Sequence, residues 1–418
     1  MIRRLQGWDK MFYKGKIMTP IVLRFAKHSD VAPHAEMLAQ KVLAFQIGSN
    51  GHVLYKNPQD VPIYDLPNIR DNEALSHYMI HKHTRPFTYA LGSIGVNDDA
   101  IVINCNHMLA DGGYLHYIID EISQGRDSQL EDDYPHSAEY LFDREIGEAP
   151  DKYLPADYDM HLTNFVTKDF PQLFSSEYAR LIISEFPADT LKCYIKDQKK
   201  IKGLTESILS NFYAAAVAYN QQGYKCGVES CVDLRRFLKK RTWSDTCIFS
   251  MIPIVAKVTP KDTLDEVGKK LRADMMKKID NGAGFAYLRA IYQNKTGPEF
   301  RGCRCEISNV GPTRIGGPLV DAYYGYSELA TAMPHIISIT SFSIIGNGRN
   351  NIIFRFKYNT DKISKREADM MSASTIFSMQ NIDKDTPLEK AIDEIDKFQK
   401  KFMKENKGTI KMFYKNKK

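Results

Sequence analysis

Hydrophobic residues in the first half of the chain follow patterns that predict both strands and helices. An apolar run at 100–106 leads into His107-Met-Leu-Ala-Asp111-Gly-Gly113, and apolar residues then recur at helical spacing to residue 123. This pattern predicts a strand, a tight turn and a helix. The other elements predicted in this half are strands at 20–25 and 89–95, a hairpin turning at Asn50-Gly51, and helices at 30–44 and 72–83.

The second half shows the same mixture of patterns. Gly203–Tyr219 is alanine-rich and predicts a buried helix with Thr205 as its N-cap, and Thr263-Leu-Asp-Glu266 is a capping box that opens a helix to about residue 280. The other elements predicted here are strands near 180–186 and at 225–233, 247–258 and 303–309, a loop from Gly311 to Pro318, a hairpin of 336–345 with 351–358, and a helix at 387–404. Since strands and helices mix without strict alternation, we expect an α+β fold.

The stretch from Gln124 to Asp169 lacks either periodicity and is rich in charges, prolines and isolated aromatic residues. We interpret it as a lid-like crossover between two lobes. The 418 residues suffice for two domains of ordinary size. We therefore divide the chain into an N-terminal lobe, 1–165, and a C-terminal lobe, 166–418.

Composition narrows the class of protein. Hydrophobic residues make up 43% and charged residues 26% of the chain, which is typical of a soluble globular protein. No apolar run approaches the roughly 18–20 residues that a membrane helix needs. The basic N-terminus is not followed by the apolar segment of a signal peptide. The seven cysteines are scattered without repeated CxxC spacing, which favours reduced thiols and a cytoplasmic location.

The charge distribution argues against a nucleic-acid-binding protein. The net charge is +6, and lysines crowd together between Lys397 and Lys418, which we interpret as a solvated helix face with a basic end. A modest positive field suits a small substrate that carries phosphate. His77 and His81 have a spacing that suits zinc, but no HExxH glutamate or nearby cysteine accompanies them. We predict no metal site.

The turn between 106 and 113 contains residues suited to acid–base chemistry. His107 is a candidate general base, and a turn directly after a strand is a rigid mount for it. Asp111 is placed to orient the histidine, to pair with an arginine, or to cap the following helix. Gly112 and Gly113 offer backbone N–H groups to a developing oxyanion. The alternative is a satisfied core histidine followed by a simple N-cap, and the turn alone leaves both open.

Several short motifs together resemble those of the CoA-dependent acyltransferase superfamily. Asn106-His107-Met-Leu-Ala-Asp111-Gly112 resembles its HxxxDG motif, which by itself is weakly specific. Other matching segments occur in the family's order along nearly the whole chain: Arg85-Pro86-Phe87, the helix at 203–219, Asp233-Leu-Arg235, Ser308-Asn309-Val-Gly-Pro312 and Tyr358-Asn-Thr-Asp361. The resemblance is strongest to the alcohol acetyltransferase and wax ester synthase branch. Condensation domains usually carry a second histidine where Asn106 stands, and the DFGWG motif of plant acyltransferases is absent.

The resemblance implies two chloramphenicol acetyltransferase-like lobes with mixed sheets and a tunnel between them. It implies that His107 deprotonates a small hydroxyl or amine acceptor, which attacks acyl-CoA as co-substrate, with no bound metal or permanent cofactor. Asp111 would hold the turn through Arg24 or, as second choice, Arg235. The residues expected to bind substrate are Ser308, Asn309, Gly113 and Arg235. The alternatives are a condensation-like enzyme that uses an acyl carrier protein, and a non-catalytic binding protein on the same fold.

Overall fold

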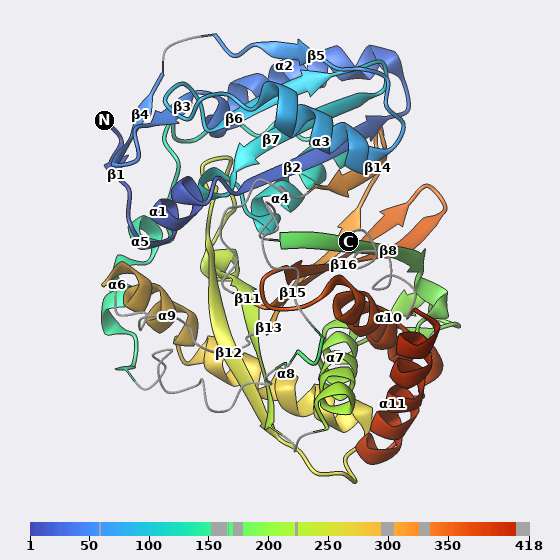
Figure 1. Cartoon of the computed structure of the whole chain (residues 1–418). Coiled ribbons are helices and arrows are strands. Elements are labelled where there is room, and N and C mark those ends of the chain that lie inside the picture. The colour runs from blue at the N-terminus through green and yellow to red at the C-terminus, as the bar shows by residue number, and fades with distance from the viewer. Residues whose placement is uncertain are drawn as a thin grey trace, which may run out of the picture.

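Two β-sheets organise the computed structural model, each at the centre of one lobe (Figure 1). The residues described are 1–57, 60–151, 165, 167–169, 179–221, 225–293, 305–325 and 335–406. The expected start of a strand at Cys303, residues 152–164 and 166 of the proposed crossover, and the residues after Asn406 therefore lie outside the described residues. Within them, the α+β architecture with mixed sheets in two lobes is confirmed.

The first lobe contains a five-stranded sheet in the order β14-β2-β7-β6-β5. Its strands are β2 (Met18–Phe25), β5 (Ile63–Asp65), β6 (Gly92–Val96), β7 (Ala100–Asn106) and β14 (Leu319–Tyr324). The longer helices of this lobe are α1 (Gly7–Lys14), α2 (Val31–Lys41), α3 (Asn72–His83) and α4 (Gly112–Ser123). A small sheet of β1 (Arg3–Arg4), β4 (Val53–Lys56) and β3 (Ile47–Ser49) lies beside them. Every residue of the central strand β7 is buried, as its continuous apolar run predicts.

The second lobe contains a six-stranded sheet in the order β12-β11-β13-β15-β16-β8. Its strands are β8 (Ala179–Pro187), β11 (Lys225–Asp233), β12 (Phe249–Lys257), β13 (Cys305–Arg314), β15 (Ile337–Gly346) and β16 (Arg349–Asn359). The helices α7 (Leu204–Asn220), α8 (Leu264–Asp280), α10 (Lys365–Asn381) and α11 (Leu388–Glu405) cover one face (Figure 1). The other face turns toward the first lobe, and we call it the interlobe face. Shorter elements are α5 (Ala138–Leu141), α6 (Asp143–Glu148), α9 (Ala283–Tyr292) and the hairpin of β9 (Tyr194–Ile195) with β10 (Lys200–Ile201).

The two lobes share a strand and a helix contact. β14 comes from the second half of the chain but pairs antiparallel with β2 at the edge of the first lobe's sheet. The start of α4 packs against β13, where Gly112 faces Val310. The turn that contains His107 therefore lies where the lobes meet.

Most elements of the predicted pattern are confirmed, and the exceptions have physical reasons. β7 and α4 have the predicted bounds, and the hairpin at Asn50-Gly51 joins β3 to β4. The predicted loop from Gly311 is wrong in its first part, because β13 continues to Arg314 beyond a register shift after Asn309. The predicted N-cap Thr205 lies inside α7, which Gly203 caps instead.

Helices α1, α9 and α10 have no counterpart in the predicted pattern. α10 buries small hydroxyl side chains as well as methionines, and the Ser374 and Thr375 hydroxyls donate to the Met371 carbonyl within the helix. Buried serines and threonines interrupt the apolar stripe by which an amphipathic helix is recognised.

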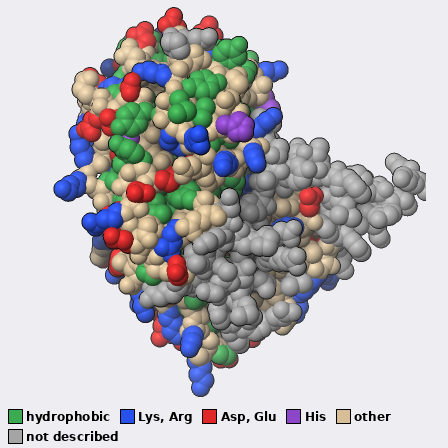
Figure 2. All heavy atoms as spheres, turned by 90° about the vertical axis from the view of Figure 1, so that its left-hand side faces the viewer, with side chains coloured by type: hydrophobic (Ala, Val, Ile, Leu, Met, Phe, Trp, Pro, Cys, Tyr) green, Lys and Arg blue, Asp and Glu red, His purple; other side chains and the backbone are tan. Residues whose placement is uncertain are grey.

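The surface and the thiols match an ordinary globular chain. On the face in Figure 2, acidic and basic side chains are interspersed over the first lobe. The six cysteines among the described residues are free thiols. No described helix is both long and apolar enough to cross a membrane.

Candidate active site

The turn after β7 is fixed by hydrogen bonds from both sides. The Asn106 side-chain oxygen accepts from the Met108 N–H at 3.1 Å, and the His107 N–H donates to the Ile17 carbonyl at 2.8 Å. Asn106, which replaces the first histidine of the condensation-type motif, thus caps the 3₁₀ turn His107–Leu109. The backbone that positions the His107 ring is held rigidly.

The His107 imidazole packs in a cluster with two aromatic rings, which also contact each other, and it makes no hydrogen bond to a described side chain. It stacks on Phe12 of α1, with 4.2 Å between the ring centroids and 2° between the ring planes. The ring centroid of Phe249, on β12, lies 5.4 Å away, and the two planes are tilted by 32°. The His107 Nδ1 is buried without a partner, and Nε2 makes no hydrogen bond to any described residue. Burial lowers the pKa of His107, although its own backbone, Asp111 and Glu306 offset part of this effect. A neutral imidazole at pH 7 is able to accept a proton.

Asp111 has the opposite environment, because both of its oxygens are occupied. Oδ1 accepts from the Tyr114 N–H at 2.9 Å as the N-cap of α4, and Oδ2 accepts from the Ile248 N–H at 2.7 Å. Arg235 Nη1 pairs with this carboxylate at 2.9 Å. Asp111 therefore holds the turn, the helix and the second lobe together.

Arg235 is the cation at the centre of this junction. Its guanidinium donates to the Asp245 carbonyl at 3.0 and 2.7 Å, in addition to its ion pairs with Asp111 and Asp233. Burial alone would lower the pKa of Arg235, but the carboxylates of Asp111 and Asp233 outweigh it and hold the pKa above its ordinary value. The side chain is 1% exposed, and its contacts are those of a structural residue.

The expected pairing of Asp111 with Arg24 is wrong. Arg24 Nη1 pairs with Asp99 at 2.6 Å, and its Nε donates to Asn72 at 2.9 Å. Arg24 and Asp99 lie at the opposite end of the β2–β7 pair from the turn, since Arg24 is in register with Ala100 and Met18 with Asn106. Arg235, the second choice, is the partner.

Gly112 and Gly113 allow α4 to approach the second lobe closely. A Cβ atom at Gly113 would lie 2.6 Å from Arg235 Nη1 and 2.7 Å from Asp233 Oδ2, while one at Gly112 would lie 3.3 Å from Val310. Side-chain atoms fit neither space without movement, least of all at Gly113. The N–H groups of both glycines donate to no described residue, so they are free at the start of the helix.

Alternation along β13 puts the two expected polar contacts on opposite faces. The Asn309 amide donates to Thr205 Oγ1 at 2.8 Å and accepts from Ser341 Oγ at 3.2 Å, so it faces α7. Ser308 points to the interlobe face, as does Glu306. We therefore keep Ser308 and omit Asn309 from the proposed substrate contacts.

The interlobe face has a polar floor in the middle of the sheet. Glu306 and Ser308 of β13 are in register with Ser338 and Thr340 of β15, and all four remain partly exposed, whereas Ile307 between them is 1% exposed. Side chains on central strands stay partly exposed only where the opposite layer does not close on them. The opposite layer therefore does not fully cover this polar floor.

Charged groups at one end of the floor act on His107. His335 Nε2 lies 2.7 Å from Glu229 and its Nδ1 3.3 Å from Glu306, which also accepts from the Cys231 thiol at 3.0 Å. Burial lowers the pKa of Lys357, on the neighbouring strand β16, to about 8, against the opposite effect of Glu306. Glu306 raises the pKa of His107 and Lys357 lowers it. Both are in register with Ser338, so their side chains leave the sheet on the same face.

The sequence did not reveal the aromatic and acidic partners of His107. Phe12 lies on helix α1, which the sequence pattern did not predict. Phe249 belongs to the second lobe and reaches the turn only because the two lobes pack together. Glu306 carries a weak signal, since polar 306 and 308 alternate with apolar 305 and 307 in one strand. No group of metal-ligating side chains that could hold an ion occurs within the described ranges.

Solved structures share the fold of this chain, although neither a family model nor a curated protein matches its sequence. The starter condensation domain of rhizomide synthetase, in complex with C8-CoA and Leu-SNAC, has a TM-score of 0.65 at 10% identity over 93% of this chain and 96% of that one. SgcC5 from Streptomyces globisporus has a TM-score of 0.63 at 12% sequence identity, and the match covers 89% of this chain and 93% of SgcC5. The epimerization domain from the third module of tyrocidine synthetase B has a TM-score of 0.61 at 12% sequence identity, and the match covers 96% of this chain and 98% of that domain.

These similarities establish the two-lobe fold of condensation-type domains. They give no support to the narrower resemblance to alcohol acetyltransferases and wax ester synthases, because the neighbours named above are of other kinds. At such low identity a shared fold does not fix an activity, which has to be argued from the site.

Proposed function

We propose that the protein transfers an acyl group from acyl-CoA to a hydroxyl or amine acceptor, with His107 as general base. The observation that carries the proposal is the His107 ring, an imidazole whose Nδ1 is buried without a hydrogen-bond partner, which stacks on Phe12 and whose pKa burial lowers. A satisfied core histidine would use at least one ring nitrogen in a hydrogen bond. In His107, Nδ1 is buried without a partner and Nε2 bonds to no described residue, which leaves Nε2 to take the proton.

The reaction follows from the groups around the ring. His107 takes the proton of the acceptor, whose oxygen or nitrogen attacks the thioester carbonyl carbon. The tetrahedral oxyanion accepts hydrogen bonds from the free N–H of Gly112 and from Ser308, and it then collapses with cleavage of the C–S bond. The protonated His107 returns the proton to the departing CoA thiolate. Asp111 and Arg235 keep the turn in place and do not touch the substrate.

The donor distinguishes this proposal from its alternatives. A rhizomide synthetase domain of the same fold has been crystallised with C8-CoA, which supports a CoA thioester here. A carrier-bound acyl group presents the same thioester and would undergo the same attack, while a binding protein on this fold would not turn it over.

Thiol release tests the proposal directly. Purified protein is mixed with acyl-CoA of several chain lengths and a panel of alcohols and amines, and free CoA is measured with a thiol reagent. We expect release that depends on the acceptor and that the His107→Ala variant loses. Activity with a carrier-bound acyl group but not with acyl-CoA would identify the carrier protein as the donor. Binding of either thioester without release of thiol would identify a non-catalytic protein.

A further inference from the structure

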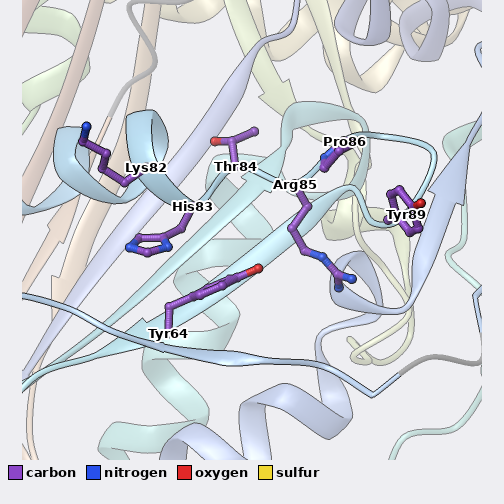
Figure 3. A pocket seen from close by; sticks show the side chains of 7 residues that line it. All are labelled: Tyr64, Lys82, His83, Thr84, Arg85, Pro86 and Tyr89. Carbon is purple, nitrogen blue, oxygen red and sulfur yellow. The ribbon is translucent and has the colours of Figure 1, made fainter.

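A pocket of about 310 Å³ opens on the first lobe where α3 ends (Figure 3). The lining residues that matter here are Tyr64, Lys82, His83, Thr84, Arg85 and Tyr89. They come from β5, from the last turn of α3 and from the segment that follows it. His107 is not among the lining residues, so this pocket is separate from the candidate active site.

The pocket carries positive charge that no described carboxylate neutralises. Lys82 and Arg85 line it, and neither makes an ion pair or a hydrogen bond to a described residue. None of the residues that line the pocket is acidic. Figure 3 shows the Arg85 guanidinium reaching toward the hydroxyl end of Tyr64 and the ring of Tyr89. Two uncompensated cations beside a hollow favour an anionic ligand.

His83 adds a polar atom without a partner. Its ring stacks on that of Tyr64, with 4.5 Å between the ring centroids and 28° between the ring planes. Its Nε2 is buried without a hydrogen bond. Native structures rarely leave such an atom unsatisfied. Together with Tyr64, the ring forms an aromatic wall of the pocket.

The dipole of α3 explains only part of this cluster. Basic residues in the last turn, including Lys82 and His83, interact favourably with the negative end of a helix. Arg85 lies beyond the C-cap Thr84, in an extended segment, and the dipole does not account for the unpartnered Nε2. The dipole end amounts to about half a charge, which two full cations outweigh for an incoming anion.

We infer that this pocket binds a phosphate group, held by Arg85 and by the exposed Lys82, whose side chain turns inward from the direction that it takes in Figure 3. Tyr89 is 47% exposed and offers an open face for a flat ring attached to the phosphate. The Asn104 amide donates to Thr84 Oγ1 at 3.0 Å, which ties the pocket wall to β7, the strand that ends at His107. The phosphate belongs either to the nucleotide end of CoA or to another phosphorylated compound. Phosphate binding stands without the proposed acyl transfer, and only the assignment to CoA rests on it.

Binding measurements on the full chain separate these sources. Inorganic phosphate, 3′,5′-ADP, CoA and dephospho-CoA are titrated by calorimetry into the wild type and into the Arg85→Gln, Lys82→Gln and Lys196→Gln variants. Lys196 is an exposed lysine on the hairpin of β9 and β10 without an ion pair, which makes it a matched control. Thermal unfolding curves check that each variant is folded.

We expect Arg85→Gln to weaken 3′,5′-ADP binding roughly tenfold or more, since it removes charge-assisted hydrogen bonds, and Lys196→Gln to leave it unchanged. Inorganic phosphate should shift the ring resonances of His83 more than those of His81 on the same helix. Tighter binding of CoA than of dephospho-CoA, lost in Arg85→Gln, identifies CoA as the source. Equal binding of CoA and dephospho-CoA, weakened alike in Arg85→Gln, identifies the diphosphate of CoA, whereas binding of inorganic phosphate without binding of either compound identifies another phosphorylated ligand. Equal affinities of Arg85→Gln and Lys196→Gln for every probe would overturn the inference, whatever the acyl-transfer assay shows.

Discussion

His107 and Asp111 lie four residues apart in one turn and have opposite environments. Both carboxylate oxygens of Asp111 accept hydrogen bonds, two of them from the second lobe, whereas both His107 ring nitrogens are free of partners among the described residues. A group with every hydrogen bond filled contributes to stability, and changing its protonation costs those bonds. The imidazole packs against Phe12 and Phe249 but adds no hydrogen bond to a described residue. The turn thus carries a fully bonded carboxylate beside an imidazole that, under the proposed function, acts on a substrate.

Removing the cation that holds Asp111 should have the largest effect on folding. We expect Arg235→Met to cost about 3–5 kcal/mol of unfolding free energy, because it leaves a buried carboxylate without its partner. Urea unfolding followed by circular dichroism measures this loss.

Arg355 provides the matched control for Arg235. It is 4% exposed, its Nε and Nη2 have no partner, and it lies over the rings of Tyr323 and Phe342. Because no carboxylate is left behind, we expect Arg355→Met to change stability by less than about 1 kcal/mol or to increase it. Equal losses in the two variants would show that the Asp111 pair is not special.

Substitution of the two glycines should separate tight contact from looser packing. Gly113→Ala places a methyl group against Arg235 and Asp233, so we expect a loss of about 1–3 kcal/mol from overpacking. Gly112→Ala meets only Val310 at 3.3 Å and should cost less. Thermal unfolding of both variants compares them, and the reverse order would contradict the geometry at this junction.

The smallest effects concern the pKa of His107. Because the base must be neutral, kcat/KM should fall as the pH drops through this pKa, which burial places below the ordinary value of about 6.5. Glu306 raises the pKa and Lys357 lowers it, so Glu306→Gln should move the acid limb to lower pH and Lys357→Met to higher pH. Profiles of kcat/KM against pH measure both shifts. A limb that stays in place in both variants would remove these groups from the surroundings of the base.

The sequence predicted the turn well because its determinants are local. A wholly buried strand reads as a continuous apolar run, so the bounds of β7 agree with the pattern, and those of α4 follow from its N-cap and helical spacing. The sequence offered both Arg24 and Arg235 as partners of Asp111 but ranked them in the wrong order, because Arg235 is 124 residues away and only the docking of the lobes selects it. The positions of Phe249 and Glu306 relative to His107 likewise depend on this docking. The partly exposed polar floor also depends on how two lobes fit, which no local pattern encodes.

The central claim, that His107 carries the proton chemistry while Asp111 carries the structure, is tested by one rate. Thiol release from acyl-CoA is measured for His107→Ala beside His81→Ala, whose histidine is exposed at the end of α3. We predict a loss of about 10²–10⁴-fold for His107→Ala, the contribution typical of a general base, with unchanged unfolding and with full activity in His81→Ala. A folded His107→Ala protein that releases thiol at the wild-type rate would contradict the account.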